Sequence, residues 1–122
     1  MERRESFNSR IKKNALKAAE IAADKKAKDT IILELKDLST IADYFVICSG
    51  ENPAQVKAIA GAIDEYFSKK KISSLGKEGL EFARWVLLDY GDIVINIFSE
   101  EARAYYELEK LWLDARKIEI GE

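Results

Sequence analysis

Two apolar, partly β-branched runs joined by Asp-Tyr-Gly-Asp occupy positions 83–98, and they restrict the fold of this chain more than any other segment. Such runs are typical of neighbouring strands, and glycine takes the positive φ of a tight turn at little cost. The sequence therefore predicts a β-hairpin that turns at Tyr90-Gly91. With a two-residue loop, the expected cross-strand pairs are Asp89 with Asp92, Leu87 with Val94, Trp85 with Asn96, and Ala83 with Phe98.

Side chains alternate between the two faces of a strand, so each face of the hairpin has its own composition. One face is almost entirely aliphatic and is expected to be covered by the core; it carries Arg84, Val86, Leu88, Ile93, Ile95 and Ile97. The other face mixes an aromatic residue, aliphatic residues, an amide and two carboxylates, a mixture that suits neither a dry core nor a freely solvated surface. From the pattern alone, this mixed face is either a core face or a binding surface. For a binding surface, we expect accessible side chains at Trp85, Leu87 and Asp89.

The length and charge of the chain limit its organisation and its partners. With 122 residues it is expected to form one domain over 1–122, with a core at about 9–115 and a short tail or strand at 116–122. The 20 basic and 22 acidic residues leave a net charge of −2, which favours little or no direct nucleic-acid binding. No apolar run approaches the roughly 20 residues that cross a bilayer, so no membrane association is expected.

Few side chains of this sequence are chemically reactive. Histidine is absent, which removes Ser-His-Asp and Cys-His catalysis as well as Cys/His zinc sites. The single cysteine, Cys48, has no internal disulfide partner, which favours a reducing, cytoplasmic location and a buried structural thiol. We expect no cofactor.

Helices and strands alternate along the rest of the chain. The expected order is a helix at 9–27 capped by Ser9, a strand at 30–36, a central strand at 43–49, a helix after the Asn52-Pro53 cap, a strand at 72–75, the hairpin, and a helix after Ser99. In the last helix, Tyr105, Leu108 and Trp112 form the expected buried stripe. This order, with a glycine turn after a strand, resembles the nucleotidyltransferase-like fold. The predicted class is therefore α/β, with a mixed sheet and helices mainly on one face.

Two other functions are compatible with these residues. Enzymes of the nucleotidyltransferase-like fold hold two metals on a strand with Asp-x-Asp or Asp-x-Glu, and the segment after Gly50 lacks such a pair. Asp89 and Asp92 still form a pair of carboxylates of the kind that begins many metal sites, although turns also favour acidic residues. A divalent-metal nucleotidyl or phosphoryl transferase is one alternative. The other is a self-associating module, a homodimer through the mixed face.

Four motifs of the chain resemble the ribosomal silencing factor family, also called Iojap-related. They are Ala-Asp-Tyr-Phe-Val-Ile-Cys-Ser-Gly at 42–50, Gln-Val-Lys-Ala-Ile-Ala at 55–60, Trp-Val-Leu-Leu-Asp-Tyr-Gly-Asp-Ile-Val-Ile at 85–95, and Ala-Tyr-Tyr-Glu-Leu-Glu-Lys-Leu-Trp at 104–112, followed by Asp114-Ala115. The resemblance spans about 14–115. It implies a non-enzymatic factor with a nucleotidyltransferase-like fold that lacks the catalytic carboxylates.

The resemblance also implies a partner and a contact surface. Members of the family bind the large ribosomal subunit through its protein fourteen, block joining of the small subunit, and dampen translation when nutrients are short. Their contact surface surrounds the Trp-x-Leu-x-Asp-Tyr-Gly-Asp motif. Carried onto this chain, the implied partner-binding residues are Trp85, Leu87, Asp89 and Tyr90, with Asp92, Val94 and Asn96 as neighbours. The family commonly has His where this chain has Asn96, which keeps a hydrogen-bonding group but removes a pH response.

Overall fold

The computed structural model describes residues 2–120 of the chain, with side chains from Ser9 onward. The elements in this range are α1 (Glu2–Asp24), β1 (Lys28–Glu34), β2 (Tyr44–Gly50), α2 (Pro53–Lys69), β3 (Gly76–Glu78), β4 (Trp85–Asp89), β5 (Ile93–Ser99), α3 (Glu100–Tyr106), the 3-10 helix η1 (Leu108–Trp112) and β6 (Arg116–Lys117). None of the helices in the described range is both long enough and apolar enough to cross a membrane.

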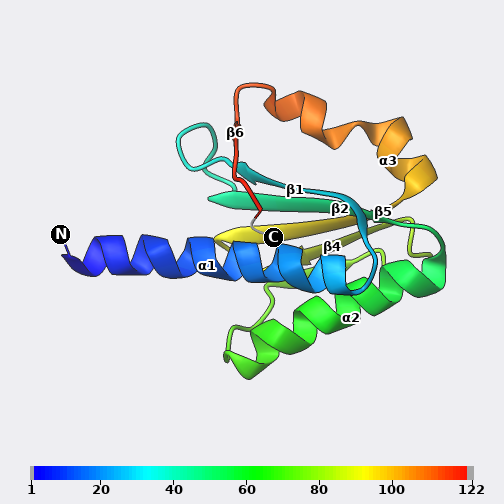
Figure 1. Ribbon diagram of the computed structural model, residues 1–122, viewed down its shortest axis with the longest axis horizontal. Coiled ribbons are helices and arrows are strands. Elements are labelled where there is room, and N and C mark those ends of the chain that lie inside the picture. The colour runs from blue at the N-terminus through cyan, green and yellow to red at the C-terminus, as the bar shows by residue number, and fades with distance from the viewer. Residues whose placement is uncertain (1, 121–122) are drawn as a thin grey trace.

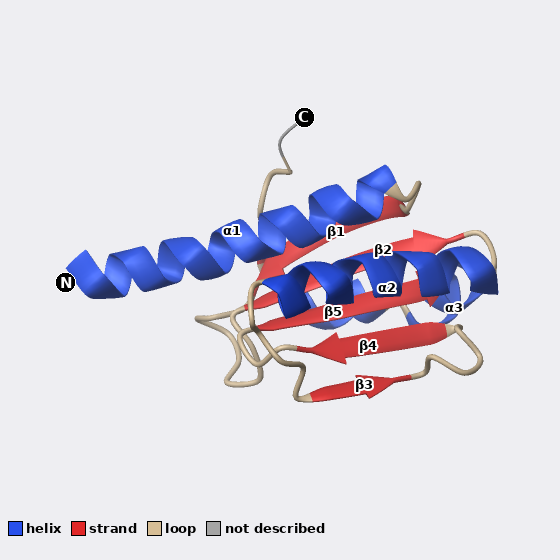
Figure 2. Cartoon of the chain, turned by 90° about the horizontal axis from the view of Figure 1, so that it is seen from below, coloured by secondary structure: helices blue, strands red, loops and turns tan. Residues whose placement is uncertain are grey.

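One sheet, with the strand order β3-β4-β5-β2-β1-β6, organises these elements. β2 and β5 run parallel and the other neighbouring pairs run antiparallel, so the predicted mixed sheet is confirmed. The long helices α1 and α2 lie on one face, and α3 with η1 lies on the other (Figure 1). Figure 2 shows β4 and β3 at the sheet edge that is farthest from β1.

β2 lies at the centre of the sheet, as its run of consecutive apolar residues predicts. All seven of its residues are buried, because helices cover both faces of the sheet at this strand; this confirms the predicted central strand. Its parallel pairing with β5 requires a crossover, in which α2 takes part. Cys48 lies in β2 without any exposed surface, and burial raises the pKa of its thiol to about 12.

Local capping signals fix the start of α2. The Asn52 side chain accepts a hydrogen bond from the Gln55 amide at 2.8 Å, and Pro53 occupies the first helical position, as the sequence predicts. The Gln55 side chain accepts in turn from the Glu51 amide. Five residues of one helical stripe are buried against the sheet: Val56, Ile59, Ala60, Ile63 and Phe67.

Two apolar clusters lie on opposite faces of the sheet. The larger one lies beneath α1 and α2, where Ala15, Ala18 and Ala22 of α1 are fully buried at the predicted helical spacing. The smaller one lies beneath α3 and η1 and includes Phe45 and Phe98, with Trp85 and Leu87 packed at its margin. The β5 half of the predicted mixed face is therefore part of the core, and its β4 half lies at the margin of this second cluster.

Several predicted boundaries are wrong, including the end of the first helix, which lies at Asp24, and the first strand, which covers Lys28–Glu34. Ser9 does not cap α1, because the helix already begins at Glu2. The predicted strand at 72–75 is irregular, and β3 forms instead at Gly76–Glu78, where the edge of β4 offers hydrogen-bonding partners. The last helix ends at Tyr106, because Glu107 adopts a left-handed conformation with φ 47°, and only then does η1 begin. As a result Tyr105 is 77% exposed rather than buried.

Candidate functional site

The hairpin exists as predicted, but its register differs by two residues. Asp89 lies opposite Val94, Leu87 opposite Asn96, and Trp85 opposite Phe98. The Tyr90 amide donates to the Ile93 carbonyl at 2.9 Å, so Gly91 and Asp92 form the two-residue loop. Gly91 is at the first loop position and has φ 86°, a left-handed backbone conformation that glycine adopts at little cost. A shift of two residues keeps every side chain on its predicted face.

The aliphatic face of the hairpin is covered by the core. Five of the six residues expected there are almost fully buried: Val86, Leu88, Ile93, Ile95 and Ile97. Arg84 is the exception, because it precedes β4 and its side chain is exposed. The prediction for this face is thus confirmed except at its first residue.

Trp85 is half-buried, and three neighbouring side chains hold it. Its ring stacks on Phe98 with centroids 4.9 Å apart, and Tyr106 of α3 lies 4.9 Å from it on a tilted plane. Its indole Nε1 donates to Asn96 Oδ1 at 3.0 Å. These contacts fix the orientation of the indole while part of the ring stays at the surface. The sequence pattern did not indicate Tyr106, because it predicted that Tyr105 lies on the buried face of that helix.

Three predicted contact residues are not at the surface of the isolated chain. Val94 is 4% exposed and Asn96 is 1% exposed, because the cluster beneath α3 and η1 covers the centre of β5. Tyr90 is also buried, but on the opposite face of the sheet, where its ring stacks on Phe67 with centroids 4.1 Å apart. Its hydroxyl donates to Asp64 Oδ1 of α2 at 2.6 Å.

Asn96 accepts a hydrogen bond from Trp85, and Tyr90 connects the hairpin to α2 through Asp64. Asn96 and Tyr90 therefore support the exposed strip of β4 from the interior and are not part of its surface. Burial and the hydrogen bond to Asp64 raise the pKa of the Tyr90 hydroxyl above its usual range.

The accessible part of the predicted site is a strip that we call the docking face, made up of Trp85, Leu87 and Asp89 of β4 with Asp92 of the turn. The three β4 side chains are half-buried and Asp92 is exposed. The strip thus presents apolar and aromatic surface with carboxylates at one end.

The two carboxylates are held by the turn. Asp89 Oδ1 accepts the Gly91 amide at 2.8 Å, which is the turn-forming role that acidic residues often have. The Asp92 carbonyl accepts the amides of Asp43 and Tyr44, so its backbone is fixed to the start of β2. Burial raises the pKa of Asp43, and the nearby Asp92 raises it further.

The observed register does not support the metal-pair hypothesis. Asp89 and Asp92 are not cross-strand partners, because Asp89 lies opposite Val94. Among the side chains that the structure describes, no group of three or more His, Cys, Asp or Glu residues is placed to hold a metal ion.

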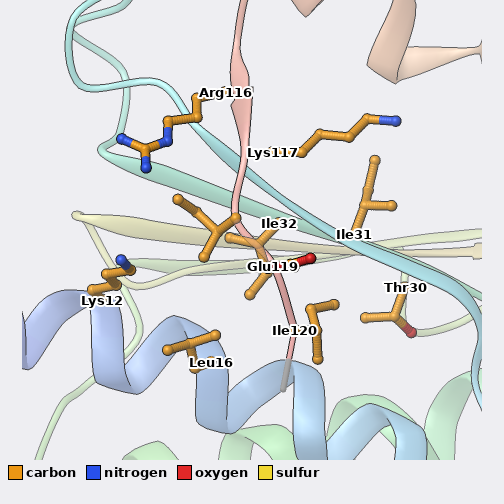
Figure 3. Close-up of a pocket in the computed structure, with 10 residues that line it drawn as sticks. Lys12, Leu16, Thr30, Ile31, Ile32, Arg116, Lys117, Glu119 and Ile120 are labelled. Carbon is orange, nitrogen blue, oxygen red and sulfur yellow. The ribbon is translucent and has the colours of Figure 1, made fainter. Parts of the chain in front are cut away.

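A separate hollow lies at the other edge of the sheet. It is an open groove of about 730 Å³ between α1, β1 and the C-terminal segment (Figure 3). Its lining is mainly aliphatic and also includes Thr30, one carboxylate, Glu119, and three cations: Lys12, Arg116 and Lys117. The sheet order places this groove at the opposite edge from β3 and β4, so it does not contribute to the docking face.

Comparison with known proteins gives a consistent result. The family model described as "Ribosomal silencing factor during starvation" matches residues 8–122. The chain is 46% identical to "Ribosomal silencing factor RsfS" of Halalkalibacterium halodurans over 80% of this chain and 83% of that protein. It is 45% identical to the protein of the same name from Bacillus subtilis, over 84% and 88% of the two chains.

A more distant relative and a crystal structure extend the comparison. "Mitochondrial assembly of ribosomal large subunit protein 1" of Mus musculus is 32% identical over 70% of this chain and 39% of its own length. A crystal structure of a Bacillus halodurans protein superimposes with a TM-score of 0.76 at 39% identity, covering 91% of this chain and 98% of that one.

Proposed function

The chain belongs to the ribosomal silencing factor family, and on this premise we propose that it binds the large ribosomal subunit and prevents the small subunit from joining. The name of the mouse relative, which refers to assembly of the ribosomal large subunit, supports the choice of that subunit as the partner. Within the large subunit, the proposed contact is its protein fourteen. The cytoplasmic location expected from the sequence follows from this role and stays a prediction.

The docking face supports a protein partner of basic character. Trp85 and Leu87 supply aromatic and aliphatic surface that a partner would remove from water, and aromatic residues with restricted rotamers are frequent hot spots of interfaces. Asp89 and Asp92 add negative charge at the end of the strip, which favours and orients a positively charged surface. Ribosomal proteins bind RNA phosphates and are rich in such surfaces.

The proposed mechanism is steric and requires no chemical step. A domain seated on the joining face of the large subunit occupies space that the small subunit must enter. The strength of repression is then set by how long the domain stays bound, which depends mainly on the dissociation rate of the interface.

A subunit-joining assay on sucrose gradients tests this proposal. Large and small subunits are mixed with and without the chain, and the expected result is a shift from joined ribosomes to separate subunits, with the chain migrating with the large subunit. Leu87→Ala should weaken this effect about five- to thirtyfold, corresponding to a loss of about 1–2 kcal/mol of binding.

The matched control is Leu38→Ala, which makes the same change at a partly exposed leucine in the loop between β1 and β2. This variant should act as the unmodified chain does. Joining that is unaffected by the unmodified chain would contradict the proposal. Sedimentation of the chain alone shows whether the docking face pairs with a second copy instead.

A further inference from the structure

β3 extends the docking face by one strand. Its register against β4 places Glu78 opposite Leu87 and Lys77 opposite Leu88. Leu88 is buried on the face covered by α2, and Lys77 on that same face bonds Asp64 of α2 at 2.6 Å. Glu78 must therefore point to the opposite face, beside Leu87, because neighbouring residues of a strand alternate.

The position of Glu78 is fixed by the residue that follows it. Gly79 has φ 82°, and a Cβ atom built there would lie 2.0 Å from the Trp85 carbonyl oxygen. The backbone of Gly79 thus lies directly against the backbone of Trp85, an approach that only glycine permits. The Ala83 amide donates to the Gly79 carbonyl at 2.9 Å and closes the connection to β4. The backbone that follows Glu78 is thus packed against the start of β4.

Three residues of neighbouring strands form a row across this face: Glu78 of β3, Leu87 of β4 and Asn96 of β5. Glu78 is exposed, and within the described side chains it makes no ion pair of 4.0 Å or less. Asn96 is 1% exposed, and its Nδ2 finds no hydrogen-bond acceptor in the part of the chain that the structure describes. The row therefore combines an unpaired carboxylate, an apolar centre and an amide with a free donor.

Asp89 is the second carboxylate next to Leu87. Its cross-strand neighbour is Gly76, which has no side chain and leaves open space beside it. Glu78 and Asp89 are diagonal neighbours on adjacent strands, and such pairs are about 7–8 Å apart. A guanidinium or ammonium group placed between them reaches both carboxylates, while its aliphatic stem lies on Leu87.

We propose that Glu78 is a specificity-determining residue of the docking face, which with Asp89 binds one arginine or lysine side chain of the partner protein over Leu87. The inference rests on the proposed function, because it assigns a further contact to the same surface.

Binding of the full-length chain to purified large ribosomal subunits tests this assignment. Glu78→Lys should weaken binding about tenfold or more at low salt, and Glu78→Gln about threefold, because the first adds repulsion and the second only removes attraction. Raising the salt concentration should reduce the difference between Glu78→Gln and the unmodified chain. The matched control is Glu20→Lys on α1, an exposed glutamate on the other face of the sheet, which should bind within about twofold of the unmodified chain.

The outcomes separate this inference from the function on which it rests. An unmodified chain that does not bind large subunits overturns both. An unmodified chain that binds, with Glu78→Lys and Glu78→Gln equal to it, overturns only the role of Glu78. If Glu78→Lys loses binding but also unfolds, as judged by its melting temperature, the test rests on Glu78→Gln. Weaker binding of Glu78→Gln that recovers at high salt supports the role of Glu78, and unchanged binding overturns it. An equal loss in Glu20→Lys would indicate a general charge effect and would overturn the assignment.

Discussion

Replacing Tyr90 by phenylalanine tests whether this residue supports the docking face from behind. The phenylalanine ring keeps the stacking on Phe67, so the change removes only the hydroxyl that donates to Asp64 at 2.6 Å. A hydrogen bond to a charged acceptor contributes about 1.5–3 kcal/mol. The Asp64 side chain is 31% exposed and keeps Lys77, so water replaces part of the loss, and we expect about 1–2 kcal/mol of lost stability.

Urea denaturation followed by tryptophan fluorescence measures this loss, and the melting temperature should fall by about 4 °C per kcal/mol in a domain of this size. Tyr66→Phe is the matched control, because its hydroxyl donates to the neutral side chain of Asn14 at 2.9 Å and should contribute less, about 0.5–1.5 kcal/mol. Binding to large subunits at 25 °C should stay within about twofold for Tyr90→Phe. A binding loss without a stability loss would refute the supporting role and place Tyr90 in the interface.

The same hydrogen bond should affect stability at low pH. Burial acts to raise the pKa of Asp64, but the hydrogen bonds from Lys77 and Tyr90 together lower it below its usual value. A carboxyl whose pKa is lower in the folded state stabilises the fold above its unfolded pKa, and this contribution is lost as pH falls through the folded pKa. Tyr90→Phe should therefore lose less stability than the unmodified chain between neutral pH and acid. Equal acid sensitivity of the two proteins would contradict this linkage.

Three further outcomes follow from the structure. Gly79→Ala should destabilise the domain by more than about 2 kcal/mol in urea denaturation, because its Cβ would overlap the Trp85 carbonyl. An unchanged urea midpoint would show that the backbone at Gly79 moves away from Trp85 at little cost. Asp92→Asn should lower the pKa of Asp43 in an NMR titration, because a like charge next to a partly buried carboxyl is removed, and an unchanged pKa would show that the two carboxyls do not interact. The Cys48 thiol should resist alkylation at pH 8 in the native state and react only after unfolding; rapid native modification would contradict its burial.

The sequence predicted the elements whose signals are local. The buried run of β2, the Asn52-Pro53 cap and the Ser99 cap are each encoded within a few residues, and all three are present; Ser99 Oγ accepts the Ala102 amide at 3.1 Å. The two faces of the hairpin were also predictable, because alternation does not depend on the register. The α/β class with a mixed sheet followed from the order of these elements.

The features that were missed depend on contacts between distant segments. The register depended on whether Gly91 takes the first or the second loop position, and the turn places it first. Tyr90 is different, because alternation along β4 already places its ring on the face of Val86 and Leu88, where it contacts Phe67 and Asp64; only the family motif had placed it in the contact surface. Asn96 is buried because α3, and then η1 after the left-handed turn at Glu107, cover β5; the sequence pattern did not indicate that turn.

Hydrogen exchange of the chain, free and bound to large ribosomal subunits, tests the central claim most directly, because it reports which face the partner covers. Binding through the docking face should slow exchange of the amides of β3, β4 and the turn at Gly91, while amides on α1 and α2 keep their rates. Slower exchange confined to α1 and α2, with β3 and β4 unchanged, would contradict the account.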